Sequence, residues 1–210
     1  PTQPMAFPGN WPDELFWFTG DADIVQGGVD LTYVSALEAA YGGAGGVVAG
    51  QQISFARIRV FADVPSIGTY TLTHPYGIEV FEVDTVDAGR EIQFTRDIGI
   101  AAPGDFTGAL KGDIGPFLVR VDANGNPSLI TAADGVFIGD PNVTQRVTGS
   151  PFGTNFVRIE GPGGIDFTTD QFFISGLVYP GALASPLVVD RTTYSRATGQ
   201  TQLQLDVFAK

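Results

Sequence analysis

The chain has 210 residues, 43% of them hydrophobic and 16% charged, a size that suits one large all-β domain or two small ones. Its net charge of −12 argues against nucleic acid and anionic membrane surfaces as partners, and no apolar run reaches the ~20 residues that span a bilayer. The absence of cysteine excludes disulfides and thiolate metal sites, while 28 glycines and 14 prolines favour many turns and short strands.

The N-terminal stretch Pro1–Pro12 is rich in proline and aromatic residues, so we expect an extended arm laid over a surface. Because the chain starts at Pro1 rather than Met, we also expect that it was processed or excised from something longer and that any signal peptide is already gone. The run Leu15–Phe18 is apolar on both faces, which predicts a covered strand with Trp17 in the core. Trp11, between an asparagine and a proline, is expected on the surface.

A short helix is predicted over residues 31–41. Leu31, Val34 and Leu37 have helical spacing, Asp30 is a suitable N-cap, and the glycine-rich run Gly42–Gly46 ends the element.

After Gln51 the hydrophobic pattern changes to a period of two, which predicts strands separated by turns that contain proline, glycine or aspartate. Residues 101–115 are rich in glycine and poorly periodic, so we expect a long loop there. Asn124-Gly125 is a strong hairpin signal. The predicted strands cover residues 52–62, 68–74, 78–83, 90–96, 116–122, 128–131, 136–139, 144–149, 154–160 and 171–178.

A weak internal repeat relates Thr73–Gly77 to Gly149–Gly153 at an offset of 150 − 74 = 76 residues. Pro75 then corresponds to Pro151 and Gly77 to Gly153. The repeat, about 53–100 against 130–178, predicts a β-sandwich, jelly-roll or immunoglobulin-like, with a duplicated β motif.

The segment Tyr179–Pro186 reads as a boundary that ends a core domain at about residue 180. Residues 181–210 contain two further strand-like runs, 187–195 and 201–209. Because a lone hairpin is marginal in water, this tail is expected to pair with the main sheet, to begin a further domain or to pair with another molecule.

Several short sequence motifs together resemble those of a family of exported bacterial proteins to which no activity is assigned. The resemblance implies a secreted or cell-surface location and a multi-domain precursor, and it brings no catalytic residues. The motifs are Phe7–Glu14, Val34–Ala40, Ile53–Arg59, Thr73–Gly77, Ile114–Leu118, Gly139–Val143, Gly149–Asn155, Thr193–Arg196 and Asp206–Ala209.

His74 is the one histidine, so a Ser-His-acid triad would have to use it. Its counterpart in the second repeat is Ser150, which favours a structural turn built on His74, Pro75 and Gly77 and repeated at Pro151 and Gly153. A pair of catalytic carboxylates is a second route to hydrolysis, although no pair among the many acidic residues is selected by spacing.

Calcium is the metal that fits this composition best, because only hard oxygen ligands are plentiful. Asp122, Asn124 and Asn126 stand at alternate positions, as at the start of a calcium loop, but the later acidic ligand is missing and the hairpin is complete without metal. Gly20–Asp23 with Asp30, and Asp166 with Asp170, are weaker calcium candidates.

Aromatic residues gather near the N-terminus beside carboxylates, a combination that can hold a sugar ring by stacking and hydrogen bonding. The candidate ligand-binding residues are Trp11, Asp13 and Asp21.

Three hypotheses of function follow. We favour a non-enzymatic structural or adhesive protein of the cell exterior that self-assembles through its terminal arm or by strand exchange, or that binds another extracellular protein. The alternatives are a carbohydrate-binding module of a larger secreted protein and a hydrolase.

Overall fold

The computed structural model describes residues 4, 6–43, 45–87, 89–181, 189–195 and 204–209. The described chain is almost entirely β-structure, with two short 3₁₀ turns, η1 (Thr107–Lys111) and η2 (Pro162–Gly164). In this part of the chain no helix combines the length and apolar character needed to cross a membrane. The prediction of an all-β fold is confirmed.

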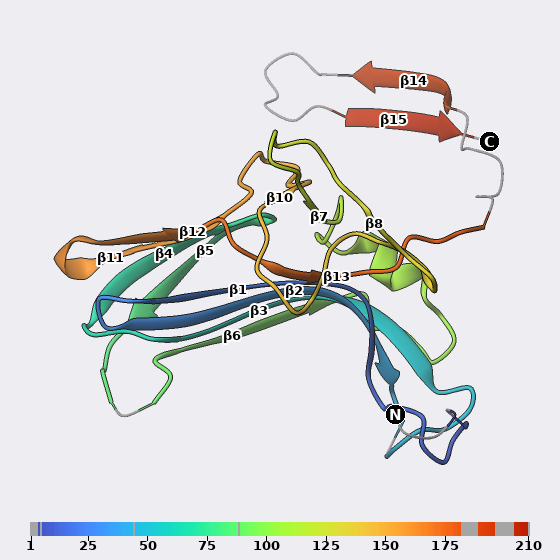
Figure 1. The fold of residues 1–210 in the computed structure, drawn as a ribbon, viewed down its shortest axis with the longest axis horizontal. Helices are drawn as coiled ribbons and strands as arrows, with labels where there is room; N and C mark the ends of the chain where they lie inside the picture. The colour runs from blue at the N-terminus through green and yellow to red at the C-terminus, as the bar shows by residue number, and fades with distance from the viewer. Residues whose placement is uncertain are drawn as a thin grey trace. The chain divides into compact units, whose positions relative to one another are not determined.

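The first compact unit, Pro1–Val178, contains two antiparallel sheets packed face to face (Figure 1). The five-stranded sheet has the order β13-β1-β2-β3-β6 and the four-stranded sheet the order β12-β11-β4-β5. Their strands are β1 (Leu15–Gln26), β2 (Val29–Tyr41), β3 (Gln52–Asp63), β4 (Gly68–His74), β5 (Gly77–Val83), β6 (Ile92–Ile98), β11 (Val157–Gly161), β12 (Ile165–Thr169) and β13 (Phe173–Ser175). Two small pairs accompany them: β7 (Val119–Arg120) with β10 (Val147–Thr148), and β8 (Ile130–Ala132) with β9 (Gly135–Phe137).

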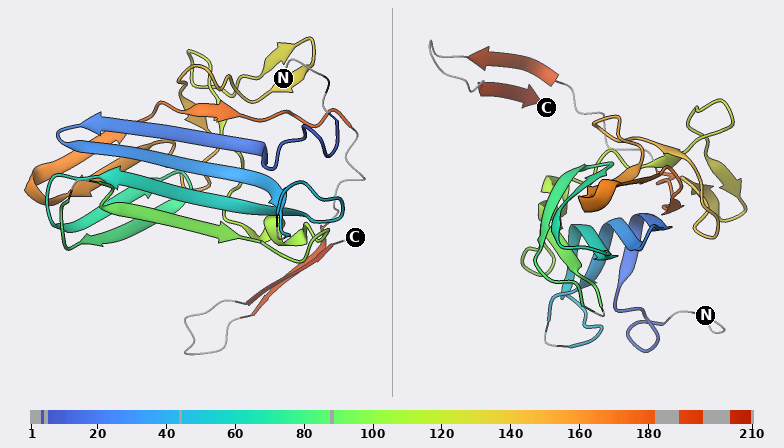
Figure 2. Two further views of the ribbon diagram at one scale, coloured as in Figure 1. Left: turned by 90° about the horizontal axis from the view of Figure 1, so that it is seen from below. Right: turned by 90° about the vertical axis from the view of Figure 1, so that its left-hand side faces the viewer.

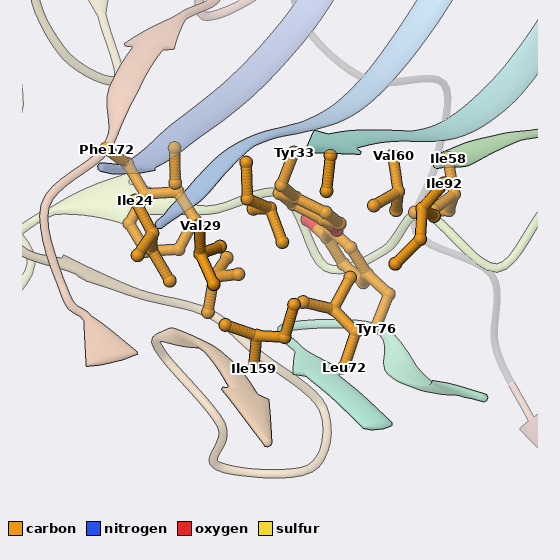
Figure 3. Close-up of a cluster of buried hydrophobic side chains, with 14 of the residues drawn as sticks. Ile24, Val29, Tyr33, Ile58, Val60, Leu72, Tyr76, Ile92, Ile159 and Phe172 are labelled. Atoms are coloured by element: carbon orange, nitrogen blue, oxygen red, sulfur yellow. The ribbon is translucent and has the colours of Figure 1, made fainter. Parts of the chain in front are cut away.

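The hydrophobic core lies between the two sheets (Figure 3). On β3, Ile58 and Val60 are fully buried, while the alternate residues Arg57 and Arg59 lie on the opposite face. Tyr33 of β2 projects into the same space as Tyr76, which follows β4 (Figure 3). This period-two burial is the main stabilising term, at about 25 cal/mol per Å² of apolar surface removed from water.

The helix predicted over residues 31–41 is wrong, because Val29–Tyr41 is strand β2. The two-residue turn Gly27-Gly28, with φ of 60° and 85°, reverses the chain between β1 and β2, and only glycine adopts this geometry without strain. Asp30, predicted as an N-cap, instead pairs with Val25 on one side and Asp63 on the other. Pairing along both edges overrides the helical spacing of the apolar residues.

Most strands predicted after residue 51 are present, since β3, β4, β5 and β6 each cover the predicted range to within a few residues. The hairpin at Asn124-Gly125 is also confirmed, because Val121 bridges to Pro127 and the Gly125 amide donates to the Asp122 carbonyl. Strand β12 falls between the predicted strands 154–160 and 171–178 and was not predicted.

The two copies of the internal repeat pair differently in the structure. In the first copy, β4 and β5 form a hairpin that turns at Pro75-Tyr76. In the second copy, β10 pairs with β7, whereas β11 lies between β12 and β4. The second copy therefore pairs with the first, through β11 and β4, and does not repeat the hairpin of β4 and β5.

The second compact unit, Tyr179–Lys210, contains β14 (Val189–Ser195) and β15 (Gln204–Ala209), which pair antiparallel. These strands fall within the predicted runs 187–195 and 201–209. Residues 182–188, 196–203 and 210 lie outside the described part of the chain, as do residues 1–3 and 5 of the predicted arm.

Candidate aromatic binding site

An aromatic pocket of about 190 Å³ lies at the end of the five-stranded sheet where β1 begins and β2 ends. The N-terminal segment and the loop between β2 and β3 are at this same end (Figure 1). Both tryptophans of the chain line the pocket. Its lining residues are Phe7, Trp11, Pro12, Leu15, Trp17, Ala39, Ala40, Tyr41, Gln52, Ile53 and Phe106.

A β-bulge turns Trp17 out of the core. Phe16 pairs with Glu38 and Phe18 with Leu37, so Trp17 is the extra residue in β1. A bulge of this kind re-aims side chains, and here Trp17 is 52% exposed while Phe18 is fully buried. The prediction that Trp17 belongs to the core is therefore wrong, because strict alternation breaks at this position.

The N-terminal segment, residues 6–14, forms one wall of the pocket. Asn10 closes the turn of this segment. Its backbone amide donates to the Ala6 carbonyl at 3.1 Å, and its side-chain oxygen accepts the Ala6 backbone amide at 2.5 Å. Trp11 packs edge-on against Phe7, with 6.2 Å between ring centroids. Trp11 is consequently partly buried, and its indole forms a wall of the pocket rather than a free surface.

Next to the pocket, on the sheet face that points away from the core, one arginine holds three carboxylates. Arg57 binds Asp97 with two hydrogen bonds of 2.7 and 2.8 Å, and its Nη1 lies 3.0 Å from Glu38 and 3.7 Å from Glu14. Figure 2 (left) shows this sheet face on, with β2, β3 and β6 side by side. The guanidinium also lies 4.9 Å from the Phe55 ring centroid, a cation–π contact.

Burial, with a smaller contribution from Glu14, raises the pKa of Glu38 to about 7 against the opposing effect of Arg57. The Glu38 side chain is 2% exposed.

The candidate residues Asp13 and Asp21 do not line the pocket. Other residues of the N-terminal segment that carries Asp13 do line it. Asp13 is exposed beside Pro12, and Asp21 lies in the middle of β1 between Val34 and Phe173. Burial, with a smaller contribution from Asp23, raises the pKa of Asp21 to about 7, and its Oδ1 has no hydrogen-bond partner among the described residues.

His74 is fully buried between the two sheets. Its Nδ1 accepts the Tyr76 amide at 3.2 Å and lies 3.1 Å from the Tyr33 hydroxyl. Because Nδ1 is an acceptor, the proton of the neutral ring belongs on Nε2, which is 3.8 Å from Glu79. The groups at Nδ1 are a phenol and an amide, not the carboxylate that a catalytic triad would place there.

Burial lowers the pKa of His74 to about 4, with a further contribution from Arg96. Arg96 lies at the edge of this site and bridges Glu79 to Asp113. The ring therefore stays neutral and enclosed, an arrangement suited to packing rather than to proton transfer with a substrate.

The turn residues around His74 take part in a contact between the two repeat copies. Pro75 is buried, Gly77 has φ 153° and Gly153 has φ 75°, both in the region that favours glycine, while Pro151 is exposed. The Ser150 hydroxyl donates to the Pro75 carbonyl, which joins the two turns.

At the predicted calcium loop, Asp122 binds the loop's own backbone. Its Oδ1 accepts the amides of Asn124 at 2.8 Å and Asn126 at 3.0 Å, and these bonds lower the pKa of Asp122. Across the described residues, His, Asp and Glu side chains form no group of three or more that could hold a metal ion. Calcium binding at this loop stays a prediction.

No protein-family model, curated protein or solved structure matches the chain. The function is therefore argued from the chain's own residues.

Proposed function

We propose that this protein is a non-enzymatic adhesive protein of the cell exterior, and that its aromatic pocket holds a sugar ring of a neutral glycan. The observation that carries the proposal is the convergence of both tryptophans on one solvent-open pocket. Aromatic faces beside polar groups bind sugar rings by stacking on C–H groups, with hydrogen bonds at the ring edge.

The size of the pocket limits what it can take. Its volume of about 190 Å³ is below the ~300–1,000 Å³ typical of drug-sized ligands, so it suits a terminal ring of a longer chain. Gln52 supplies side-chain donors and an acceptor to the lining. The net charge of −12 and the carboxylates beside the pocket disfavour anionic polysaccharides.

Exposed apolar side chains around the pocket support an interaction site. Phe16, Leu15 and Phe7 are all exposed large hydrophobic residues near Trp17, and a cluster of this kind on a soluble protein marks a binding surface. Apolar burial would supply the affinity and the polar rim the orientation.

A glycan panel tests the proposal with the whole chain and two variants. We expect binding to fall by about tenfold in Trp17→Ala, equivalent to about 1.4 kcal/mol. Phe152→Ala is the matched control, because Phe152 is an exposed aromatic residue outside the pocket lining, and it should bind as the wild type does. Failure of the folded wild type to bind any glycan, or full binding by Trp17→Ala, would refute the proposal.

Self-assembly by strand exchange is the second candidate. The supporting observation is that β14 and β15 form a two-stranded sheet in a unit of their own, and two strands alone are marginal in water. Light scattering on the chain with and without residues 179–210 tests this candidate: an unchanged mass would remove strand exchange through β14 and β15.

A further inference from the structure

Four charged side chains from four parts of the chain meet beside the aromatic pocket. Glu38 comes from β2, Arg57 from β3, Asp97 from β6, and Glu14 from the N-terminal segment just before β1. With every group ionised, three carboxylates face one guanidinium, so the cluster carries two uncompensated negative charges. Binding of a proton or separation of the groups would relieve this imbalance.

The guanidinium is already committed to Asp97. Both Asp97 oxygens accept from it, through Nε and Nη2, which leaves Nη1 for the two glutamates. Nη1 lies 3.0 Å from Glu38 and 3.7 Å from Glu14, so both carboxyl groups lie within 4 Å of one nitrogen. One proton held between them turns a repulsion into a hydrogen bond.

Because Glu38 and Arg57 are buried, the proton between the two glutamates has a large effect on the energy of the cluster. Glu38 is 2% and Arg57 14% exposed, whereas Glu14 is 46% exposed and able to move into solvent. If Glu38 ionises, the lowest-energy response is for Glu14 to leave, because Glu38 keeps its contact with Arg57. Glu14 is thus the mobile member of the pair.

Glu14 is also the ionic contact by which the N-terminal segment meets the sheet among the described residues. The hydrogen bonds of Asn10 close the segment on itself, through Ala6 and Pro4. Phe7, Trp11 and Pro12, which form a wall of the pocket, all lie within the eight residues that precede Glu14. Displacement of Glu14 would loosen this wall.

We propose that the N-terminal segment docks against the sheet through a proton on Glu38 that is shared with Glu14, so that the aromatic pocket is complete while Glu38 is protonated and opens as Glu38 ionises. The role in glycan binding rests on the proposed function, but the docking itself needs no ligand. Burial and the neighbouring Glu14, which raise the pKa of Glu38 to about 7, set the range in which the change is expected.

Tryptophan fluorescence tests this directly, because both tryptophans of the chain line the pocket. The full-length protein is titrated without ligand from about pH 5 to about pH 9, with circular dichroism to establish that the sheets stay intact. We expect the emission maximum to move to longer wavelength as pH rises, with a midpoint near the pKa of Glu38.

Two variants separate the shared proton from other titrations. In Glu14→Gln the amide donates to the Glu38 carboxylate at any pH, so the emission should stay constant across the range. Asp21→Asn is the matched control, since Asp21 has a similarly raised pKa on the same sheet but lies outside the pocket lining, and it should keep the transition.

A pH-independent emission in the wild type, or an unchanged transition in Glu14→Gln, would overturn the proposal. Because the readout involves no glycan, loss of the transition and loss of glycan binding are separate results. The glycan panel run at about pH 6 and about pH 8 then shows whether docking controls binding.

Discussion

The Ser150 hydroxyl donates a hydrogen bond of 2.7 Å to the carbonyl oxygen of Pro75, a residue 75 positions earlier in the chain. The same Ser150 oxygen accepts the amides of Phe152 and Thr154, and the Thr154 hydroxyl donates to the His74 carbonyl. One small side chain thereby shapes its own turn and joins it to the turn at the tip of β4 and β5. The two repeated motifs seen in the sequence meet at this point.

Ser150→Ala should destabilise the fold by about 1–3 kcal/mol, because it leaves partly buried amide and carbonyl groups without partners. Urea denaturation followed by circular dichroism measures the change. Ser128→Ala is the control, since Ser128 has similar burial and its hydroxyl makes no hydrogen bond within the described residues. Equal losses for the two variants would contradict the role given to Ser150.

Truncation of two adjacent residues of β1 should change the free energy of unfolding by very different amounts. Phe18 is fully buried and stacks on Phe117 with 4.8 Å between centroids, so Phe18→Ala should cost about 3–5 kcal/mol. Trp17→Ala should change the free energy of unfolding by less than about 1 kcal/mol, because the bulge leaves the side chain outside the core and 52% exposed. Thermal unfolding of both variants measures this, and a large loss of stability for Trp17→Ala would contradict the placement of its side chain outside the core.

His74 should weaken the fold in acid. Its folded-state pKa of about 4 is below the unfolded value of 6.5, so between these values only the unfolded chain binds the proton, and stability falls as pH falls. In His74→Asn the asparagine side-chain oxygen can replace Nδ1 as acceptor. This substitution should lower the free energy of unfolding most near neutral pH and progressively less toward pH 4. A stability difference that does not vary with pH would show that His74 is not the group responsible.

Asp21 should act in the opposite direction. Its folded-state pKa of about 7 is above its ordinary 3.8, so the folded protein holds a proton across this window and loses stability as pH rises through it. Asp21→Asn should therefore stabilise the protein above about pH 7 and have little effect near pH 4. Asp30→Asn, on the exposed part of β2, is the control and should show no such trend.

Local patterning predicted the strands β3 to β6 because one face of each is buried and the period of two is visible in the residues. The same reasoning failed at β2. Leu31, Val34 and Leu37 satisfy a helical period, and what decides the outcome is pairing with β1 and β3 along the whole element. The Gly27-Gly28 turn was the local signal for a hairpin.

The site was only partly visible in the sequence. Trp11 is predicted on the surface among the N-terminal aromatic residues, and in the structure it is partly buried in the pocket lining. Trp17 is predicted in the core because a bulge leaves no mark in an all-apolar run. The cluster of Glu14, Glu38, Arg57 and Asp97 could not be found from spacing. It depends on the register of β2, β3 and β6 and joins residues up to 97 − 14 = 83 positions apart, which only the folded sheet brings together.

The most direct test of glycan binding is the response of the two indole N–H signals in a ¹⁵N–¹H correlation spectrum of the full chain. Both signals come from the pocket, one from Trp11 and one from Trp17. Titration with a neutral oligosaccharide that the panel selects should shift both signals, with the Trp17 signal saturating at the affinity measured for binding. A glycan that binds while both indole signals stay unmoved would place recognition elsewhere and contradict the account.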